Sequence, residues 1–403
     1  MSIKRNKRGM KVFILVGTAT CLFTLILGRS YATQKHCFLN MGIAYYHKGE
    51  YEKARQAFEN YLKSHPASFP AHYNLAVTLL IEKKYGEAEK HLKRCIQLKP
   101  NYPEINFQLG NISFYKKDYS HAIQYYQREL EINPEHILSI YNLGKIYHLQ
   151  GNIAQAVKNM EEALQLKPDF GEAYTELGKI YHEQGNIQEA IRLLSRAVEK
   201  KPEDLYAHLY LGEVYEEEKE WEKALLHFLK AISIEPANIY AQTQIGFIYL
   251  QKKDFSKAIP YLEKAVQIDP AKVIPRYYLG WAYSKVGKID EAICQYSEIL
   301  KKKARFKDTF YRLGNLYFEK QEYSKAIDCY KKELELNPTN SDAAYNLAIV
   351  YFKQGKLDSA IEAVKKTIQI NPEDKTAHSL LGDIYMKKEM YDEAIKEYEK
   401  ATR

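Results

Sequence analysis

The stretch Gly171–Asp204, GEAYTELGKIYHEQGNIQEAIRLLSRAVEKKPED, decides the fold because it recurs along the chain. Its landmark is a small residue followed three places later by an aromatic residue, here Gly178 and Tyr181. Steps of 34 residues reach the same small position eleven times, at Gly42, Ala76, Gly110, Gly144, Gly178, Gly212, Gly246, Gly280, Gly314, Ala348 and Gly382. A fixed period of this length indicates a repeat architecture and is interpreted before any single motif.

Each half of the unit has the spacing of an amphipathic helix. The positions that share a face are Tyr174, Leu177, Gly178 and Tyr181 in the first half, and Ala190, Leu194 and Ala197 in the second. Gly185 lies between the halves, where a helix can end in a left-handed residue, and Pro202 ends the second helix. The unit is therefore predicted to be a helical hairpin that buries its apolar faces only by stacking on its neighbours.

These residues resemble the tetratricopeptide pattern of Leu-Gly, Tyr, Ala, Phe and Pro at fixed spacing. Repeat six carries it as Leu211, Gly212, Tyr215, Ala224, Phe228 and Pro236, and repeat one as Gly42, Tyr45, Ala54, Phe58 and Pro66. The departures are Ala76, Ser113, Ala304 and Ala348. The resemblance implies an all-α, right-handed superhelix whose first helices line a concave face, and whose usual work is to hold peptides or proteins.

The period also sets the domain boundaries. It predicts one solenoid over residues 35–403, with no linker rich in proline, glycine or serine. The repeats start near residues 35, 69, 103, 137, 171, 205, 239, 273, 307, 341 and 375. Residues 1–34 precede the register and form a separate segment.

That first segment has the pattern of an export signal or a signal anchor. Five cations, Lys4, Arg5, Lys7, Arg8 and Lys11, precede an apolar run over residues 12–28. As a helix the run spans about 25 Å, short of a hydrocarbon core of about 30 Å. Ser30–Ala32 offers a cleavage pattern after Ala32. Two locations stay open: a single-pass protein in the cytoplasmic membrane with its repeats outside the cytoplasm, or a cleaved, secreted or periplasmic protein.

The net charge of +8 does not predict a nucleic-acid partner. Six of the 59 basic residues lie in residues 1–34, which leaves 53 basic against 51 acidic residues in the repeats. A phosphate-binding surface needs a clustered excess of cations. The run Lys301–Lys307 falls at the end of a second helix, where cations suit the helix dipole, so we interpret it as a solvated helix end.

The repeats contain no recognised catalytic motif. They lack a phosphate loop, a nucleophile elbow and a zinc-protease motif, so we predict no enzyme activity, no cofactor and no metal. The cysteines at 37, 95, 294 and 329 form no C-x-x-C pair and are predicted to be mainly buried thiols. A disulfide between Cys294 and Cys329, which lie in adjacent repeats, stays open.

The face of each first helix that packing leaves free gives the candidate groove. At one offset the first four repeats carry amides, Asn40, Asn74, Gln108 and Asn142, which could pair with the backbone of an extended segment. Asparagine is also common at this position in the family pattern. The face then becomes acidic in repeats five and six, at Glu176, Glu213, Glu216 and Glu217. From repeat eight it becomes aromatic, at Tyr277, Trp281 and Tyr311, where an apolar side chain of a partner could anchor.

One branch of the family grips acidic C-terminal tails with lysine, asparagine and arginine. Asn111 with Asn142, and Asn315 with Asn346, match its amide pair, but Phe107, Glu172 and Glu176 occupy the positions of the cations. The sequence therefore favours a non-enzymatic scaffold that binds extended protein segments. The alternatives are a recognition subunit of an enzyme complex, such as a glycosyltransferase, and a self-assembling structural protein, so a homo-oligomer also stays open.

Overall fold

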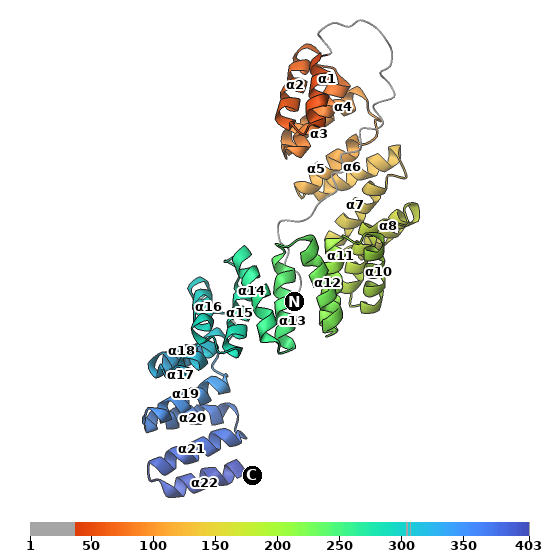
Figure 1. Cartoon of the computed structure of the whole chain (residues 1–403). Helices are drawn as coiled ribbons and strands as arrows, with labels where there is room; N and C mark the ends of the chain where they lie inside the picture. Colours follow the sequence, from red (N-terminus) through yellow and green to blue (C-terminus); the bar gives the residue numbers. More distant parts are fainter. Residues whose placement is uncertain (1–36, 304, 307, 403) are drawn as a thin grey trace. The chain divides into compact units, whose positions relative to one another are not determined.

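The computed structural model describes residues 37–303, 305–306 and 308–402. Its regular structure is entirely helical across these residues, with twenty-two helices in sequence and no strand (Figure 1). The prediction of an all-α chain of helical hairpins is therefore confirmed. The predicted signal or anchor helix lies outside the described residues. No helix in the described part of the chain is both long and apolar enough to span a membrane.

Contacts divide the chain into two compact units, Met1–Tyr210 and Leu211–Arg403. In the first unit the first helices of the repeats are α1 (Cys37–His47), α3 (Phe69–Ile81), α5 (Ile105–Tyr115), α7 (Ile137–Leu149) and α9 (Gly171–Glu183). The second helices are α2 (Tyr51–Ser64), α4 (Tyr85–Leu98), α6 (Tyr119–Ile132), α8 (Ile153–Leu166) and α10 (Ile187–Lys200). Helix α11 (Leu205–Glu217) contains the boundary between the units.

The second unit continues the alternation. Its first helices are α13 (Ile239–Gln251), α15 (Val273–Lys285), α17 (Thr309–Glu319), α19 (Ser341–Lys353) and α21 (Lys375–Lys387). Its second helices are α12 (Trp221–Ile234), α14 (Phe255–Ile268), α16 (Ile289–Lys302), α18 (Tyr323–Leu336), α20 (Leu357–Ile370) and α22 (Tyr391–Thr402). Away from α11, each helix packs on the helices before and after it within its unit, as α14 does on α13 and α15. First helices of successive repeats also touch, as α7 does with α9 and α13 with α15.

Close approach explains the small residue of the motif. A Cβ atom added to Gly178 would lie 2.5 Å from Cγ of Leu194 and 3.3 Å from the carbonyl oxygen of Ala190. Both Leu194 and Ala190 are fully buried. The helices of the hairpin therefore meet at Gly178 and Ala190, as the spacing predicts.

The turn inside each hairpin uses one left-handed residue. Gly185 has φ +77°, as expected from its place after the first helix. The equivalent positions in the other ten repeats also have positive φ: Gly49, Lys83, Lys117, Gly151, Lys219, Lys253, Gly287, Gln321, Gly355 and Glu389. Only glycine adopts this conformation without strain. Packing of the two helices therefore imposes the turn even where the residue is lysine, glutamine or glutamate.

The joint between repeats is fixed by a side chain of the first helix. The ring Nε2 of His72 lies 3.0 Å from the carbonyl oxygen of Pro66, and His378 bonds in the same way to Pro372. Equivalent bonds join His208 to Pro202, Gln242 to Pro236 and Arg276 to Pro270. The proline ends one repeat, and its carbonyl anchors the next.

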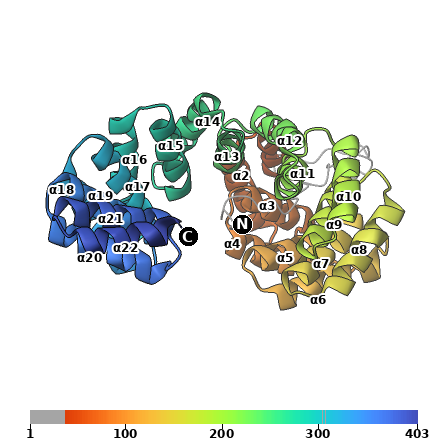
Figure 2. The ribbon, with the colours of Figure 1, turned by 90° about the horizontal axis from the view of Figure 1, so that it is seen from below.

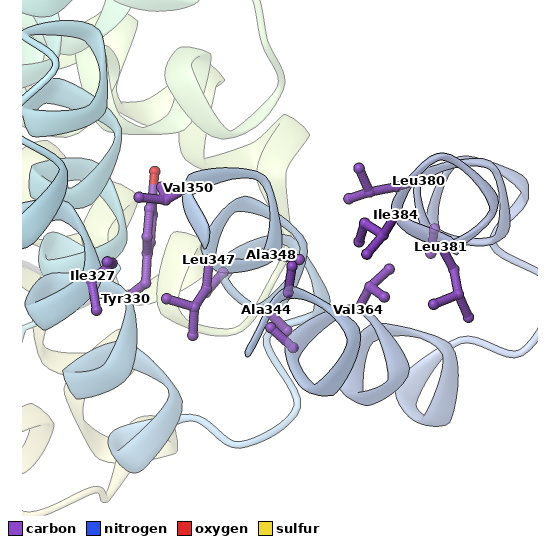
Figure 3. Packing of buried hydrophobic residues seen from close by; sticks show 14 of the residues in the cluster. Ile327, Tyr330, Ala344, Leu347, Ala348, Val350, Val364, Leu380, Leu381 and Ile384 are labelled. Atoms are coloured by element: carbon purple, nitrogen blue, oxygen red, sulfur yellow. The ribbon is translucent and has the colours of Figure 1, made fainter. Parts of the chain in front are cut away.

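Clusters of buried hydrophobic residues extend across several successive helices. Figure 3 shows the C-terminal cluster, in which Tyr330, Leu347, Val364 and Leu381 come from four successive helices. Tyr330 and Val364 are fully buried, and Leu347 and Leu381 nearly so. No hairpin could bury these side chains alone, so stacking is the source of stability.

Candidate functional site

All eleven residues predicted to line a groove lie on first helices. They are Asn40 on α1, Asn74 on α3, Gln108 on α5, Asn142 on α7, Glu176 on α9, Glu213, Glu216 and Glu217 on α11, Tyr277 and Trp281 on α15, and Tyr311 on α17. In Figure 2 the first helices α7 and α9 lie on one side of the second helices α8 and α10. Within each unit, residues that are 34 apart in sequence therefore follow one another along a single face.

The four amides differ in accessibility. Asn40 is exposed and Asn74 half-buried, whereas Gln108 and Asn142 are only 3% and 2% exposed. The Nδ2 atom of Asn142 donates to Oδ1 of Asn111 at 3.1 Å and to the hydroxyl of Tyr126 at 3.2 Å. Tyr126 in turn donates to Oδ1 of Asn111 at 2.8 Å. Buried amides need such partners, so Asn142 joins repeats three and four.

The same Asn–Tyr–Asn network recurs in the second unit. The hydroxyl of Tyr330 donates to Oδ1 of Asn315 at 2.7 Å, and Nδ2 of Asn346 donates to the same oxygen at 2.9 Å. Both amide pairs are predicted from the sequence, but the tyrosine between them is not. The available signal was the spacing, because a tyrosine follows Asn111 and Asn315 by the same number of residues.

The glutamates of repeat five are neutralised by cations of this chain. Glu176 lies 3.0 Å from Nδ1 of His148, whose Nε2 lies 2.9 Å from Glu183. Burial alone would raise the pKa of Glu176, but the bond from His148 and the charges of Lys179 and Lys145 lower it to about 2. Burial opposes protonation of His148, yet the two carboxylates raise its pKa. Repeat five therefore presents less negative charge than its sequence indicates.

Repeat six keeps a crowded acidic surface. Glu213 is 7% exposed, Glu216 is half-buried and Glu217 is exposed at the end of α11. Gln244 donates a hydrogen bond to Glu216. Burial is the main cause that raises the pKa of Glu216 to about 7, and the negative charges of Glu213 and Glu217 add to it. A positive group brought to this surface would be stabilised by these charges.

Replacing Glu216 with glutamine should stabilise the protein at pH 8 and have little effect at pH 5. A group whose folded pKa is raised contributes stability that is present below its unfolded pKa, near 4.5, and lost as pH rises through about 7. Glutamine avoids that loss, by about 1–2 kcal/mol after allowance for solvent screening. Chemical denaturation at both pH values, followed by circular dichroism, measures the difference. Glu222→Gln is the control, because Lys252 lowers the pKa of that exposed carboxylate; equal effects of the two variants would contradict the assignment.

Two aromatic residues of repeat eight, Tyr277 and Trp281, contact the guanidinium of Arg312 in repeat nine. Tyr277 is 5% exposed, and Trp281 and Tyr311 are half-buried. The guanidinium carbon of Arg312 lies 5.2 Å from the ring centre of Tyr277 and 5.4 Å from that of Trp281. Distances below about 6 Å give a favourable cation–π interaction. Arg312 is not among the predicted site residues, although steps of 34 residues from Asn142 reach it.

Sequence models of the repeat family match most of the chain. Models described as "Tetratricopeptide repeat" or "TPR repeat" match residues 39–103, 103–136, 147–210, 183–239, 239–272, 314–355, 341–374 and 376–403. The chain belongs to the tetratricopeptide repeat (TPR) family. The resemblance noted in the motif is therefore confirmed.

Solved structures also resemble the TPR chain. One, titled "Crystal structure of MamA", is 34% identical, covers 39% of this chain and 92% of its own, and has a TM-score of 0.38. MamA from Desulfovibrio magneticus RS-1 is 22% identical over 41% of this chain and 93% of its own, with a TM-score of 0.39. A TPR protein from Parabacteroides merdae ATCC 43184 is 18% identical over 62% and 98%, with a TM-score of 0.43. A comparison with curated proteins found no significant match.

The described TPR residues include no group of histidine, cysteine, aspartate and glutamate side chains that could hold a metal ion. Cys95 is buried, which raises the pKa of its thiol to about 12 and makes it a poor nucleophile. Cys294 is exposed and Cys329 half-buried, and both are free thiols in the structure. The first-helix face carries amides, carboxylates, aromatic rings and the stacked guanidinium of Arg312, which can form hydrogen bonds, ion pairs and stacking contacts.

Proposed function

We propose that this TPR protein is a non-enzymatic scaffold that binds extended segments of other proteins along its first-helix face. The observation that carries the proposal is the partial burial of polar and aromatic side chains on that face. The first helices present half-buried Asn74, Glu216 and Trp281. The second helices instead carry exposed positions such as Lys90 and Leu226. Half-buried polar and aromatic side chains of this kind suit the anchor residues and the rim of a protein interface.

The face offers different chemistry along the chain. Asn40 and Asn74 offer amides near the start of the repeats, where they could pair with backbone groups. Internal cations offset the glutamates of repeat five, so the preference for a basic stretch rests on the glutamates of α11. We further propose that residues 1–34 export the repeats or anchor them at the cytoplasmic membrane, because five cations precede the apolar run 12–28.

Photo-crosslinking in the native cell tests both parts of the proposal. A photoreactive amino acid at Asn74 or Trp281 should capture discrete proteins, whereas the same residue at Lys90 or Leu226, exposed on second helices, should not. Mass spectrometry identifies the captured proteins, and they should be exported or membrane proteins. Capture from the second-helix positions alone would contradict groove binding, and capture of only cytosolic proteins would contradict export.

A further inference from the structure

The Asn–Tyr–Asn network has a third, altered copy in repeats eight and nine. The tyrosine is kept as Tyr296, but Trp281 stands where Asn111 and Asn315 stand in the other copies. Arg312 stands at the position of Asn142 and Asn346. In the two intact copies the tyrosine hydroxyl and the second amide both donate to the oxygen of the first amide, although Nδ2 of Asn111 has no partner. The substitutions remove both amides, so the altered copy needs a different set of partners.

The altered copy leaves a donor without an acceptor. Tyr296 is fully buried, and its hydroxyl has no hydrogen-bond partner. The Nε atom of Arg312 donates to the hydroxyl of Tyr277 at 2.9 Å and pairs with Asp308 at 3.0 Å. The hydrogen bonds of Arg312 to Tyr277 and Asp308 come from Nε, and its guanidinium also lies close to the hydroxyl of Tyr296. A buried donor without an acceptor is costly, which marks the place where an acceptor from a ligand would bind.

The geometry holds the guanidinium ready for such an acceptor. Tyr277 and Trp281 contact it through their rings, while Asp308 fixes its Nε edge. The Arg312 side chain is 27% exposed, so a ligand can reach the η edge. A guanidinium whose η pair is available binds a carboxylate through two parallel hydrogen bonds. Lys303 and Arg305, exposed in the segment before α17, add positive charge.

We propose that Trp281, Tyr296 and Arg312 form a carboxylate-binding site, which takes a glutamate or aspartate side chain of the bound segment. The proposal rests on the proposed function, since it names the chemistry that one part of the groove recognises. It also replaces the expected apolar anchor at Trp281, because Arg312 already covers that ring and the ring of Tyr277. The carboxylate would accept from the η nitrogens of Arg312, with the Tyr296 hydroxyl beside it as a further donor.

The test uses the fluorescence of Trp281. The chain has two tryptophans, so Trp221 is replaced to leave Trp281 as the single tryptophan that emits. In the full-length Trp221→Phe protein, hexaglutamate that is acetylated and amidated at its ends should change the emission of Trp281 saturably at low salt. Hexaglutamine with the same end groups should not. Arg312→Gln should weaken hexaglutamate binding about tenfold or more, because hydrogen bonds to a charged group are lost.

Arg276→Gln is the matched control for charge. That arginine is on α15, where Nε donates to Pro270 and Nη1 to Gln295, so it faces the second helix. Equal binding by the Arg312 and Arg276 variants would overturn the site, as would a stronger response to inorganic phosphate than to hexaglutamate. Arg312→Lys, which keeps the charge but lacks the planar fork, should bind more weakly than the parent even if Arg312→Gln fails to fold. If hexaglutamate does not bind but crosslinking at Asn74 still captures partners, the carboxylate site is wrong and the scaffold function stands.

Discussion

Replacing Gly212 with leucine should lower the free energy of unfolding by about 3 kcal/mol or more, the largest effect that we expect from a single substitution. A Cβ atom at Gly212 would lie 2.7 Å from Cε1 of Phe228, whereas carbon atoms pack at about 3.5–4.0 Å. Phe228 is fully buried and cannot move aside without disturbing its neighbours. Overpacking of a core typically costs about 1–3 kcal/mol, and leucine adds three more carbons beyond the clash.

Denaturation by guanidinium, followed by circular dichroism, measures the loss. Gly86→Ala is the control, because Gly86 is a helical glycine with nothing within 4 Å of an added Cβ atom. That variant should be more stable than the parent by up to about 1 kcal/mol, since alanine favours the helix. If Gly86→Ala and Gly212→Leu changed the free energy of unfolding in the same direction, the packing argument would be wrong.

The chain supplies a template for rescue. At the equivalent contact Ala76 stands where Gly212 does, and the residue sixteen places later is Leu92 instead of Phe228. Both Ala76 and Leu92 are fully buried. Gly212→Ala combined with Phe228→Leu should therefore recover part of the stability lost in Gly212→Ala alone. The gain appears as a favourable coupling energy in a double-mutant cycle.

Local features of the fold could be predicted because the same pattern of residues recurs in all eleven repeats. The close approach at Gly178 and the left-handed turn at Gly185 are properties of one hairpin, and its own residues reveal them. The end of α10 at Lys200, just before Pro202, has the same local origin. Repetition then removes ambiguity, since a small residue at one fixed position in every copy cannot be a chance feature of one helix.

Pairing between repeats could not be predicted in the same way. The sequence makes Asn142 a candidate ligand, but in the structure it is bonded to Asn111 and Tyr126. The sequence likewise presents Glu176 as a surface charge, but His148 lies beside it and pairs with it. The partners lie on different helices, and the choice among several side chains within reach depends on their rotamers. The period places residues on a face, but it does not say which of them satisfy one another.

A buried carboxylate at the start of α5 shows how strongly such pairing can matter. Glu129 on α6 is fully buried. Its Oε1 accepts from the backbone nitrogen of Glu104 at 2.8 Å, and its Oε2 accepts from that of Phe107 at 3.3 Å. Glu104, the residue before the helix, has φ +77° and provides no capping side chain of its own. A side chain from the second helix therefore caps the first helix of the same repeat.

Replacing Glu129 with alanine should lower the free energy of unfolding by about 2–4 kcal/mol, because two backbone amides lose their acceptor in a buried place. Burial raises the pKa of Glu129, because it disfavours the charged carboxylate. Glu129→Gln should therefore lose less stability than Glu129→Ala, since glutamine is neutral and keeps one acceptor oxygen. In Glu129→Ala, hydrogen exchange at the amides of Glu104 and Phe107 should accelerate more than exchange at the other amides of α5. Glu131→Ala, an exposed change on the same helix, should stay within about 0.5 kcal/mol of the parent. If Glu129→Ala matched it in both measurements, the carboxylate would not be capping α5.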